Sequence, residues 1–383
     1  MLNNRRGVAL VMVLWVMVML VLLAAGIAMM ARTETQISRN YADVNRCRWA
    51  ARAGVYGAIK NLTTLVASEP VYLGEDPYTV TSDDLSLDFG GYTFTATVGD
   101  EAGKINVNTA TEDTLTQLFG SSDIADAIIG WRTPAGSSTT VVTNDDYYAS
   151  LSPAYKCKSA NLETVQELGL VKGITTDILG GTASSSSSTT LIDMLTVYAP
   201  LKAISPSVAN QVDIETATRD SLQSSLGSVL SASDISSIIS YRTRHPFKSP
   251  AEIVLAGISR SKIERIYGQL TVSGVPTYTG LVNINSASSD VLAVMPGLDA
   301  VTASAIVDYR TSNGAFSGVG YLLAVSSVSD DAFVSAAPYL TVNTNVFTIQ
   351  SVGQLSSTGA TATITCVVEI DSDGTSQIRY WQE

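Results

Sequence analysis

Few residues in this chain could carry out acid–base or nucleophilic chemistry. The single histidine, His245, lies beside Pro246 and has no evident acidic partner that would let it act as a general base. The three cysteines, Cys47, Cys157 and Cys366, are too far apart in sequence to form a zinc-ligand motif. No GxSxG, P-loop or HExxH pattern is present. We therefore expect a protein that is not an enzyme.

Acidic residues offer one other kind of chemistry, the binding of a hard cation. Calcium takes six to eight oxygen ligands, which paired carboxylates and nearby carbonyls can supply. Among the acidic pairs we favour Asp145 and Asp146, in a long loop, as a calcium site; the alternative is that they are solvated loop acids. The D-x-D-G sequence from Asp371 to Gly374 predicts a hairpin turn instead.

Composition limits the classes of function. Only 15% of the 383 residues are charged, against about a quarter in an average soluble domain. The formal net charge of −12 repels nucleic-acid phosphates and anionic lipid head groups over most of the surface. The chain is long enough for two or three domains, each with its own core. A general nucleic-acid-binding protein is therefore disfavoured.

The elements that position these residues begin with a long helix. From Val8 to Ala31 the residues are uncharged and mostly apolar, and as a helix they would cross a hydrocarbon core of about 30 Å. Arg5 and Arg6 precede this run, which by the positive-inside rule places the rest of the chain outside the cytoplasm. From Arg32 to about Val66 apolar residues recur every three or four positions. One helix is predicted to run from the membrane into a globular part, and an ordinary signal anchor is the alternative.

The sequence Arg5-Arg6-Gly7 followed by VALVMVLWVMVMLVLLAAG resembles the amino terminus of type IV pilin-like proteins. This resemblance implies that a prepilin peptidase cuts after Gly7 and that the new amino terminus, Val8, is methylated. Most members of that family carry glutamate at the fifth mature position, which is Met12 here. The missing glutamate and the segment DEAGKINVN, from Asp100, resemble the minor pseudopilin K of type II secretion systems.

That resemblance implies a role at the tip of a pseudopilus, where the protein would cap the filament and help to initiate its assembly. The implied partners are other minor pseudopilins, the major pseudopilin below, the prepilin peptidase, and inner-membrane lipid before assembly. The implied location is the inner membrane, with the carboxy-terminal domain in the periplasm. A carboxylate among apolar helices costs on the order of several kcal/mol unless it is neutralised. A tip subunit with no neighbour above it can therefore do without the acid at Met12.

Three segments share one pattern: INVNTATEDTL from Ile105, VDIETATRDSL from Val212 and VNINSASSDVL from Val282. Each is followed by a second apolar run, and the pairs predict helix-hairpin-helix units, with MPGL from Met295 as one hairpin turn. Each first helix is expected to begin at a capping hydroxyl. The candidates are Thr109 or Thr111, Thr216 or Thr218, and Ser286 or Ser288.

The second run of each copy ends in an aromatic residue followed by an arginine. We expect the aromatic rings to pack in or beside the core, and the arginines to bond the last carbonyls of their own helices. The three pairs are Trp131–Arg132, Tyr241–Arg242 and Tyr309–Arg310.

Helix-hairpin-helix units often bind DNA through glycine amides and basic side chains. The alternative function is therefore that of a membrane-tethered DNA-binding protein of a competence or type IV pilus system. Acidic residues outnumber basic ones around the first and third copies. We accordingly expect no nucleic-acid partner.

Together these patterns predict an α+β fold, in which a long N-terminal pilin helix packs on an antiparallel sheet and a large helical insertion separates early from late strands. The expected divisions are a leader at 1–7, the pilin helix at 8–66 with its assembly half at 8–31, early strands at 67–103, hairpin units at 104–211, 212–275 and 276–345, and late strands at 346–383. Tracts at 134–140 and 180–190 are expected to be flexible loops.

Three cysteines in an oxidising compartment allow one disulfide and leave one residue without a partner. Cys47 lies in the predicted long helix, and Cys366 lies in a predicted strand that could pack on it. A Cys47–Cys366 bond is therefore possible, and the pairings with Cys157 stay open.

Overall fold

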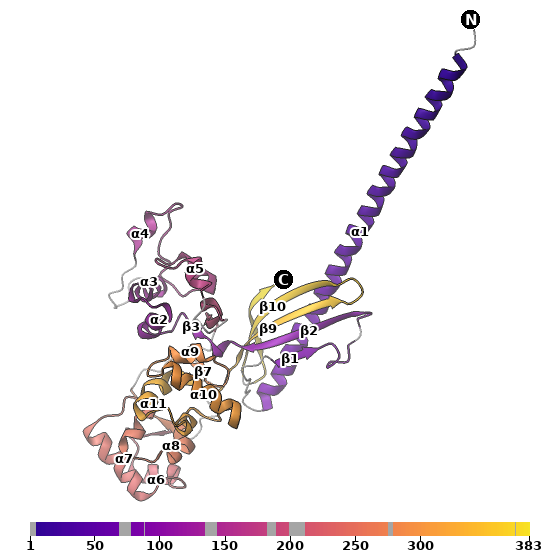
Figure 1. The fold of residues 1–383 in the computed structure, drawn as a ribbon. Helices are drawn as coiled ribbons and strands as arrows, with labels where there is room; N and C mark the ends of the chain where they lie inside the picture. Colours follow the sequence, from indigo (N-terminus) through magenta and orange to yellow (C-terminus); the bar gives the residue numbers. More distant parts are fainter. Residues whose placement is uncertain are drawn as a thin grey trace.

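The computed structural model describes residues 5–68, 78–87, 89–134, 144–181, 189–198, 211–274, 279–371 and 373–383. Most of the leader and most of the two tracts expected to be flexible loops lie outside these ranges. Figure 1 shows three parts: a long helix, a sheet packed on the end of that helix, and a group of short helices beyond the sheet.

Helix α1 (Arg5–Ser68) confirms the predicted continuous helix. Its first part projects from the molecule as a bare rod (Figure 1), and Ala9–Leu65 contains a stretch long and apolar enough to cross a membrane. Its second part packs on the sheet through small and aliphatic side chains, among them Ala51, Val55 and Leu62. Burial of each aliphatic side chain contributes about 1.5–3 kcal/mol, so this half fastens the helix to the domain.

The sheet has five antiparallel strands in the order β1-β2-β9-β10-β11. The strands are β1 (Tyr78–Thr81), β2 (Tyr92–Asp100), β9 (Val346–Leu355), β10 (Ala360–Ile370) and β11 (Ser376–Gln382). Alternate residues of β2, β9 and β10 face α1 and form one core with it. Gly353 permits this close packing, because a Cβ there would lie 1.9 Å from the carbonyl oxygen of Cys47.

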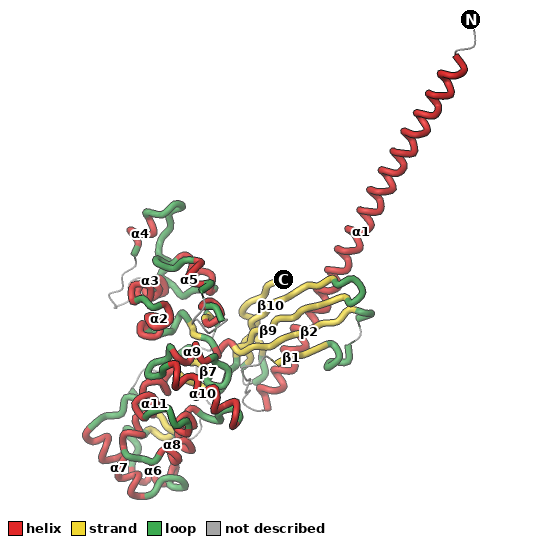
Figure 2. Tube along the Cα trace, viewed as in Figure 1, coloured by secondary structure: helices red, strands yellow, loops and turns green. Residues whose placement is uncertain are grey.

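The insertion between β2 and β9 consists of three units, each closed by a pair of parallel two-residue strands that the sequence analysis did not predict. Unit one (105–196) joins β3 (Ile105–Asn106) to β4 (Leu195–Thr196). Unit two (212–271) joins β5 (Val212–Asp213) to β6 (Leu270–Thr271). Unit three (282–341) joins β7 (Val282–Asn283) to β8 (Leu340–Thr341). Figure 2 shows these units as mainly helical bodies set apart from the sheet.

The helices within the units are short. The 3₁₀ turn η1 (Glu101–Gly103) leads into the insertion from β2. Unit one holds α2 (Glu112–Phe119), α3 (Ser122–Arg132), α4 (Asp145–Ala149), η2 (Val165–Leu170), α5 (Thr176–Leu179) and η3 (Leu191–Met194). Unit two holds α6 (Arg219–Leu226), α7 (Ala232–Arg244), η4 (Pro250–Ala256), α8 (Arg260–Ile266) and η5 (Tyr267–Gln269). Unit three holds α9 (Ser289–Ala293), α10 (Ala300–Asn313), η6 (Val319–Ala324), α11 (Asp330–Ala336) and η7 (Ala337–Tyr339).

Cys47 and Cys366 do not form the disulfide that the sequence left possible. The thiol of Cys47 donates to the carbonyl oxygen of Ala360 at 3.2 Å, at the start of β10, and both cysteines are free. Cys366 lies six positions further along this strand, a separation of about 20 Å at the usual rise per residue. A disulfide needs Cα atoms within about 7 Å.

Candidate functional site

The first candidate site is the uncovered half of α1. Every large apolar side chain from Leu10 to Ile37 is exposed, and Met12 is 65% exposed. Gly7 and Val8, the predicted processing positions, lie in the first turns of this helix. A rod with so much apolar surface must be covered by lipid or by other helices.

The second candidate site is the joint between the sheet and the hairpin units, formed by two adjacent carboxylates at the end of β2. Asp100 faces unit three: it accepts hydrogen bonds from the Asn283 amide at 2.8 Å and from the Ser286 hydroxyl. Its other oxygen accepts the backbone N–H of Ala102 at 2.7 Å. No cation contributes to these bonds, and burial raises the pKa of Asp100.

Glu101 faces unit one and the sheet. It accepts bonds from the Thr196 hydroxyl of β4 and the Thr348 hydroxyl of β9, and it pairs with the Lys104 ammonium at 2.7 Å. Burial by itself raises the pKa of Glu101, but the charge and hydrogen bond of Lys104 and the two hydroxyls outweigh burial, so its pKa is lowered. The two carboxylates thus fix two different hairpin units to one strand.

Each hairpin unit begins with the same turn. Asn106, Asp213 and Asn283 each accept, through a side-chain oxygen, the backbone N–H two residues further on, at 2.9, 2.9 and 3.0 Å. Such Asx turns direct the chain from a strand into the helix that follows. The first helices then begin at Thr111, Thr218 and Ser288, which narrows each pair of predicted caps to its second member.

The recurring arginines do not bond the last carbonyls of their own helices, so that expectation is wrong. Arg132 donates to the carbonyl oxygens of Val107 and Ala110, the latter at 2.6 Å. Arg242 and Arg310 donate to the equivalent carbonyls, of Ile214 at 2.9 Å and of Ile284 at 2.6 Å.

Each of these arginines therefore joins the second helix of its unit to the strand that opens that unit. The carboxy-terminal end of the second helix lies beside that strand, so the arginine there can donate to carbonyl oxygens of the strand. Burial lowers the pKa of Arg132 to about 10. These three guanidinium groups point inward, so they are poorly placed for phosphates, which weighs against the DNA-binding alternative.

A polar residue missed by the sequence analysis ties each opening strand to the loop after the second helix. In unit one, Asn108 donates to the Leu162 carbonyl oxygen at 2.9 Å and accepts the Leu162 N–H at 2.8 Å. In unit three, Asn285 makes the same pair of bonds with Phe316, at 3.0 and 2.8 Å. In unit two, Glu215 accepts only the N–H of Phe247, at 2.9 Å. The signal in the sequence was a polar residue at the same position of all three repeats.

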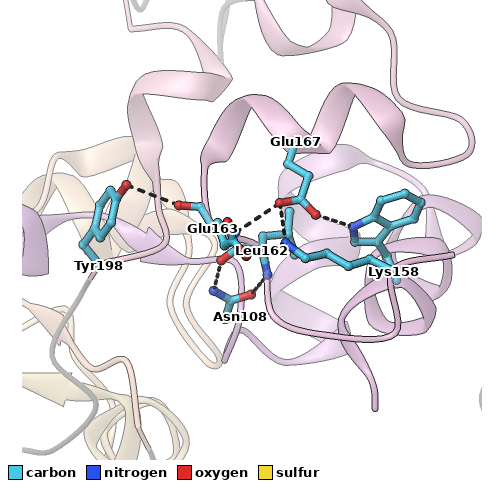
Figure 3. Close-up of polar contacts among 7 residues, drawn as sticks. Asn108, Lys158, Leu162, Glu163, Glu167 and Tyr198 are labelled. Atoms are coloured by element: carbon cyan, nitrogen blue, oxygen red, sulfur yellow. Dashed lines mark hydrogen bonds and ion pairs between the residues drawn. The ribbon is translucent and has the colours of Figure 1, made fainter. Parts of the chain in front are cut away.

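Figure 3 shows how unit one extends this contact into a network around Glu167. The Glu167 carboxylate accepts from the Trp131 indole N–H at 2.9 Å and from the Lys158 ammonium at 2.9 Å. It also accepts the N–H of Glu163 at 3.1 Å, and the Tyr198 hydroxyl donates to the Glu163 carbonyl oxygen at 3.2 Å. The pKa of Glu167 is lowered, because these donors outweigh the effect of burial.

The aromatic residues before the arginines pack as predicted. Trp131 is buried with its ring edge-on to Tyr148 at 5.2 Å. Tyr241 stacks on Phe247 at 5.0 Å, and Tyr309 stacks on Phe316 at 5.2 Å. These rings fill the space beneath the loop that the polar residue fixes.

Unit three lies between unit two and the sheet (Figure 1). Besides its bonds to Asp100, it receives the Arg260 guanidinium of unit two, which donates to Asp330 at 2.9 Å and to the Val328 carbonyl oxygen at 2.9 Å. Gly320 allows close packing here, because a Cβ would lie 2.7 Å from the Cβ of Tyr267. The third copy therefore connects unit two to the rest of the molecule.

The predicted calcium site gains no further acidic ligand. Within the described ranges no group of three or more His, Cys, Asp or Glu side chains is arranged to hold a metal. Asp145 and Asp146 begin α4, and Asp145 accepts the N–H of Cys157 at 3.3 Å. Calcium binding at these residues stays a prediction.

Comparison with family models finds two matching segments. Residues 102–181 match the family model for type II secretion system (T2SS), protein K. This segment is therefore similar to type II secretion protein K, in agreement with the resemblance seen in the sequence. Residues 278–341 match the model for the helix-hairpin-helix motif, which agrees with the prediction for the third copy.

Among solved structures, a chain of the GspK-GspI-GspJ complex from the type 2 secretion system of enterotoxigenic Escherichia coli is similar. It shares 11% identity over 90% of this chain and 98% of that chain, with a TM-score of 0.48. No curated protein matches.

Proposed function

We propose that this chain is a minor pseudopilin that caps the tip of the type II secretion pseudopilus and helps to initiate its assembly, for protein export across the outer membrane. The observation that carries the proposal is the contrast between the two ends of the molecule. The apolar rod of α1 is uncovered, whereas the opposite end carries three hairpin units beyond the sheet (Figure 1). In such a subunit the narrow rod can pack among the helices of the filament below it. The bulky head would block the addition of another subunit above it.

The partners follow from what must cover the rod. Before assembly, inner-membrane lipid covers the exposed side chains from Leu10 to Ile37, and the head lies in the periplasm. After assembly, helices of other minor pseudopilins and of the major pseudopilin below replace the lipid. Packing among apolar helices of similar length supplies this contact without a large change in exposed apolar area.

Processing by the prepilin peptidase is the first step to test. Co-expression with that enzyme is expected to remove residues 1–7 and to add a methyl group to Val8, which mass determination of the mature chain measures. A Gly7→Val variant is the matched control, because a β-branched residue obstructs cleavage there and should leave the chain uncut. A wild-type chain that keeps its first seven residues would contradict the proposal.

The absence of a carboxylate at Met12 gives a second test. Met12→Glu is expected to reduce the number of pseudopili per cell by a few-fold, because a tip subunit has no amino terminus above it to neutralise the buried charge. Met12→Gln, of similar size and uncharged, should have a smaller effect. Filaments are counted by electron microscopy, and a gold label on the head reports its position. Normal or improved assembly by Met12→Glu, or labels spread along the shaft, counts against tip capping.

A further inference from the structure

Strand β11 is an edge of the sheet with nothing paired along its outer side. It bonds only with β10, and in the part of the chain that the structure describes no other backbone hydrogen bond reaches residues 376–382. Edge strands are normally protected by charge, proline or a bulge. β11 contains no proline, and its one charged residue, Arg379, is tied to Glu369 at 2.8 Å.

A bulge is present and limits the length of the open edge. The register with β10 shifts between Val367, which pairs with Tyr380, and Val368, which pairs with Ile378. The extra residue twists the first half of β11 away from a regular ladder. The regular template is therefore the last stretch, from Tyr380 to Gln382.

A hollow of about 490 Å³ borders this stretch on the face that carries α1. Trp381 and Glu383 form one wall, and Trp49, Arg52 and Tyr56 of α1 form the other. Arg52 pairs with Glu383 at 2.6 Å and lies 4.6 Å from the centre of the Trp49 ring. Arg48 lies 4.0 Å from the same carboxylate, so two guanidinium groups meet one acid. Guanidinium groups bond carboxylates well, so this hollow suits an acidic side chain.

A second groove, of about 290 Å³, borders the same stretch on the opposite face. Tyr380 and Gln382 line it from β11, and the ring of Tyr198, two residues after the end of unit one, lies 6.1 Å from that of Tyr380. The remaining walls are mainly uncharged and polar. Of the three charged residues that line the groove, Glu101 and Lys104 neutralise each other, and Asp193 is the third. This groove favours a side chain that donates or accepts hydrogen bonds without a charge.

We propose that β11 accepts an added strand from a neighbouring minor pseudopilin. Successive side chains of an extended strand point to opposite faces of a sheet, so an incoming strand would place alternate residues in the two hollows. Its backbone would bond the free edge, while a carboxylate residue enters beside Arg48 and Arg52 and a hydroxyl or amide residue enters beside Tyr380.

The occupant is identified by continuity with the assembly helix, and in this the inference rests on the proposed function. The exposed side chains of Ile37, Tyr41 and Val44 follow one another at spacings of three or four and lead along α1 to Arg48 and Arg52. A pseudopilin whose helix covers the first three therefore brings its own head beside the hollow at Trp381.

Hydrogen exchange with mass spectrometry tests the edge directly. The full chain in detergent is measured alone and after co-purification with its partner minor pseudopilins. Because backbone groups alternate in an antiparallel ladder, the amides of Tyr380 and Gln382 face β10 and the amide of Trp381 faces the open edge. In the complex we expect the Trp381 amide to exchange at least about tenfold more slowly. Tyr78–Thr81, the opposite edge of the sheet, should not change.

A variant pair tests whether the edge contributes affinity. Trp381→Pro removes the N–H that points away from β10, so the variant cannot donate to an added strand there and should weaken binding of the partners about tenfold. Thr79→Pro removes an outward N–H at the opposite edge and should bind normally. If Trp381→Pro unfolds the sheet, the exchange measurement on the unaltered chain still decides.

The other outcomes of these experiments distinguish failure of strand addition from failure of tip capping. A complex in which the Trp381 amide exchanges as fast as in the free chain overturns strand addition and leaves tip capping intact. Slow exchange of the Trp381 amide already in the free chain overturns it as well, because the edge would then be occupied. Failure of the wild-type chain to form the complex overturns both proposals.

Discussion

Units two and three follow the same sequence pattern but are held in the molecule differently. Arg310 of unit three is only 7% exposed, whereas its counterpart in unit two, Arg242, is partly exposed. Asn285 bonds both backbone groups of Phe316, whereas Glu215 makes a single bond. The repeat therefore encodes the fold of one unit. The position of each unit among its neighbours decides how much each polar contact contributes to stability, because water can replace a lost hydrogen bond only at an exposed position.

Substitution of the recurring arginines is expected to give the largest difference in stability between units two and three. Arg310→Ala should destabilise unit three by about 2–3 kcal/mol, because it leaves the Ile284 carbonyl buried without its donor. Arg242→Ala should destabilise unit two by about 1 kcal/mol, since water reaches the freed carbonyl. Hydrogen exchange of α10 and α7 measures the two local stabilities. Equal losses would show that position in the fold does not matter.

A smaller effect should separate the two carboxylates of the joint by their response to pH. Burial raises the pKa of Asp100, so its contribution to stability is full below about pH 4, the pKa of an unfolded aspartate, and declines as pH rises toward its folded pKa. Lys104 and hydrogen bonds outweigh burial at Glu101 and lower its pKa. Its contribution is therefore present above about pH 4 and is lost as pH falls through its folded pKa.

Urea unfolding of Asp100→Asn and Glu101→Gln across pH 3–7 checks these signs. The stability of wild type minus Asp100→Asn should fall with rising pH, and that of wild type minus Glu101→Gln should rise. Parallel curves for the two variants would refute the distinction between an acid held without a cation and an acid held with one.

The smallest effect concerns the contact between units two and three. Arg260 and Asp330 are both more than one third exposed, so their pair should contribute only about 0.5 kcal/mol in a double-mutant cycle of Arg260→Ala and Asp330→Ala. The loss should shrink in high salt. A coupling above about 2 kcal/mol would mean that this ion pair, rather than the packing of Gly320 on Tyr267, joins the two units.

The sequence by itself determined the long helix, the strands around a helical insertion and the number of repeats. These are local properties: apolar periodicity, capping hydroxyls and a pattern repeated at Ile105, Val212 and Val282. It also predicted that Trp131, Tyr241 and Tyr309 pack in or beside the core, because burial of a large aromatic ring is strongly favourable.

Only the tertiary structure decided which groups meet across the chain. The arginines reach carbonyls more than twenty positions away, Asp100 reaches Ser286, and Cys47 lies at the start of β10 rather than near Cys366. Likewise, the open edge at Tyr380 lies between two hollows because α1 and unit one flank it. Such contacts depend on the relative placement of helices and strands. Periodicity does not encode this placement, because it shows which face of an element is apolar but not which other element packs against that face.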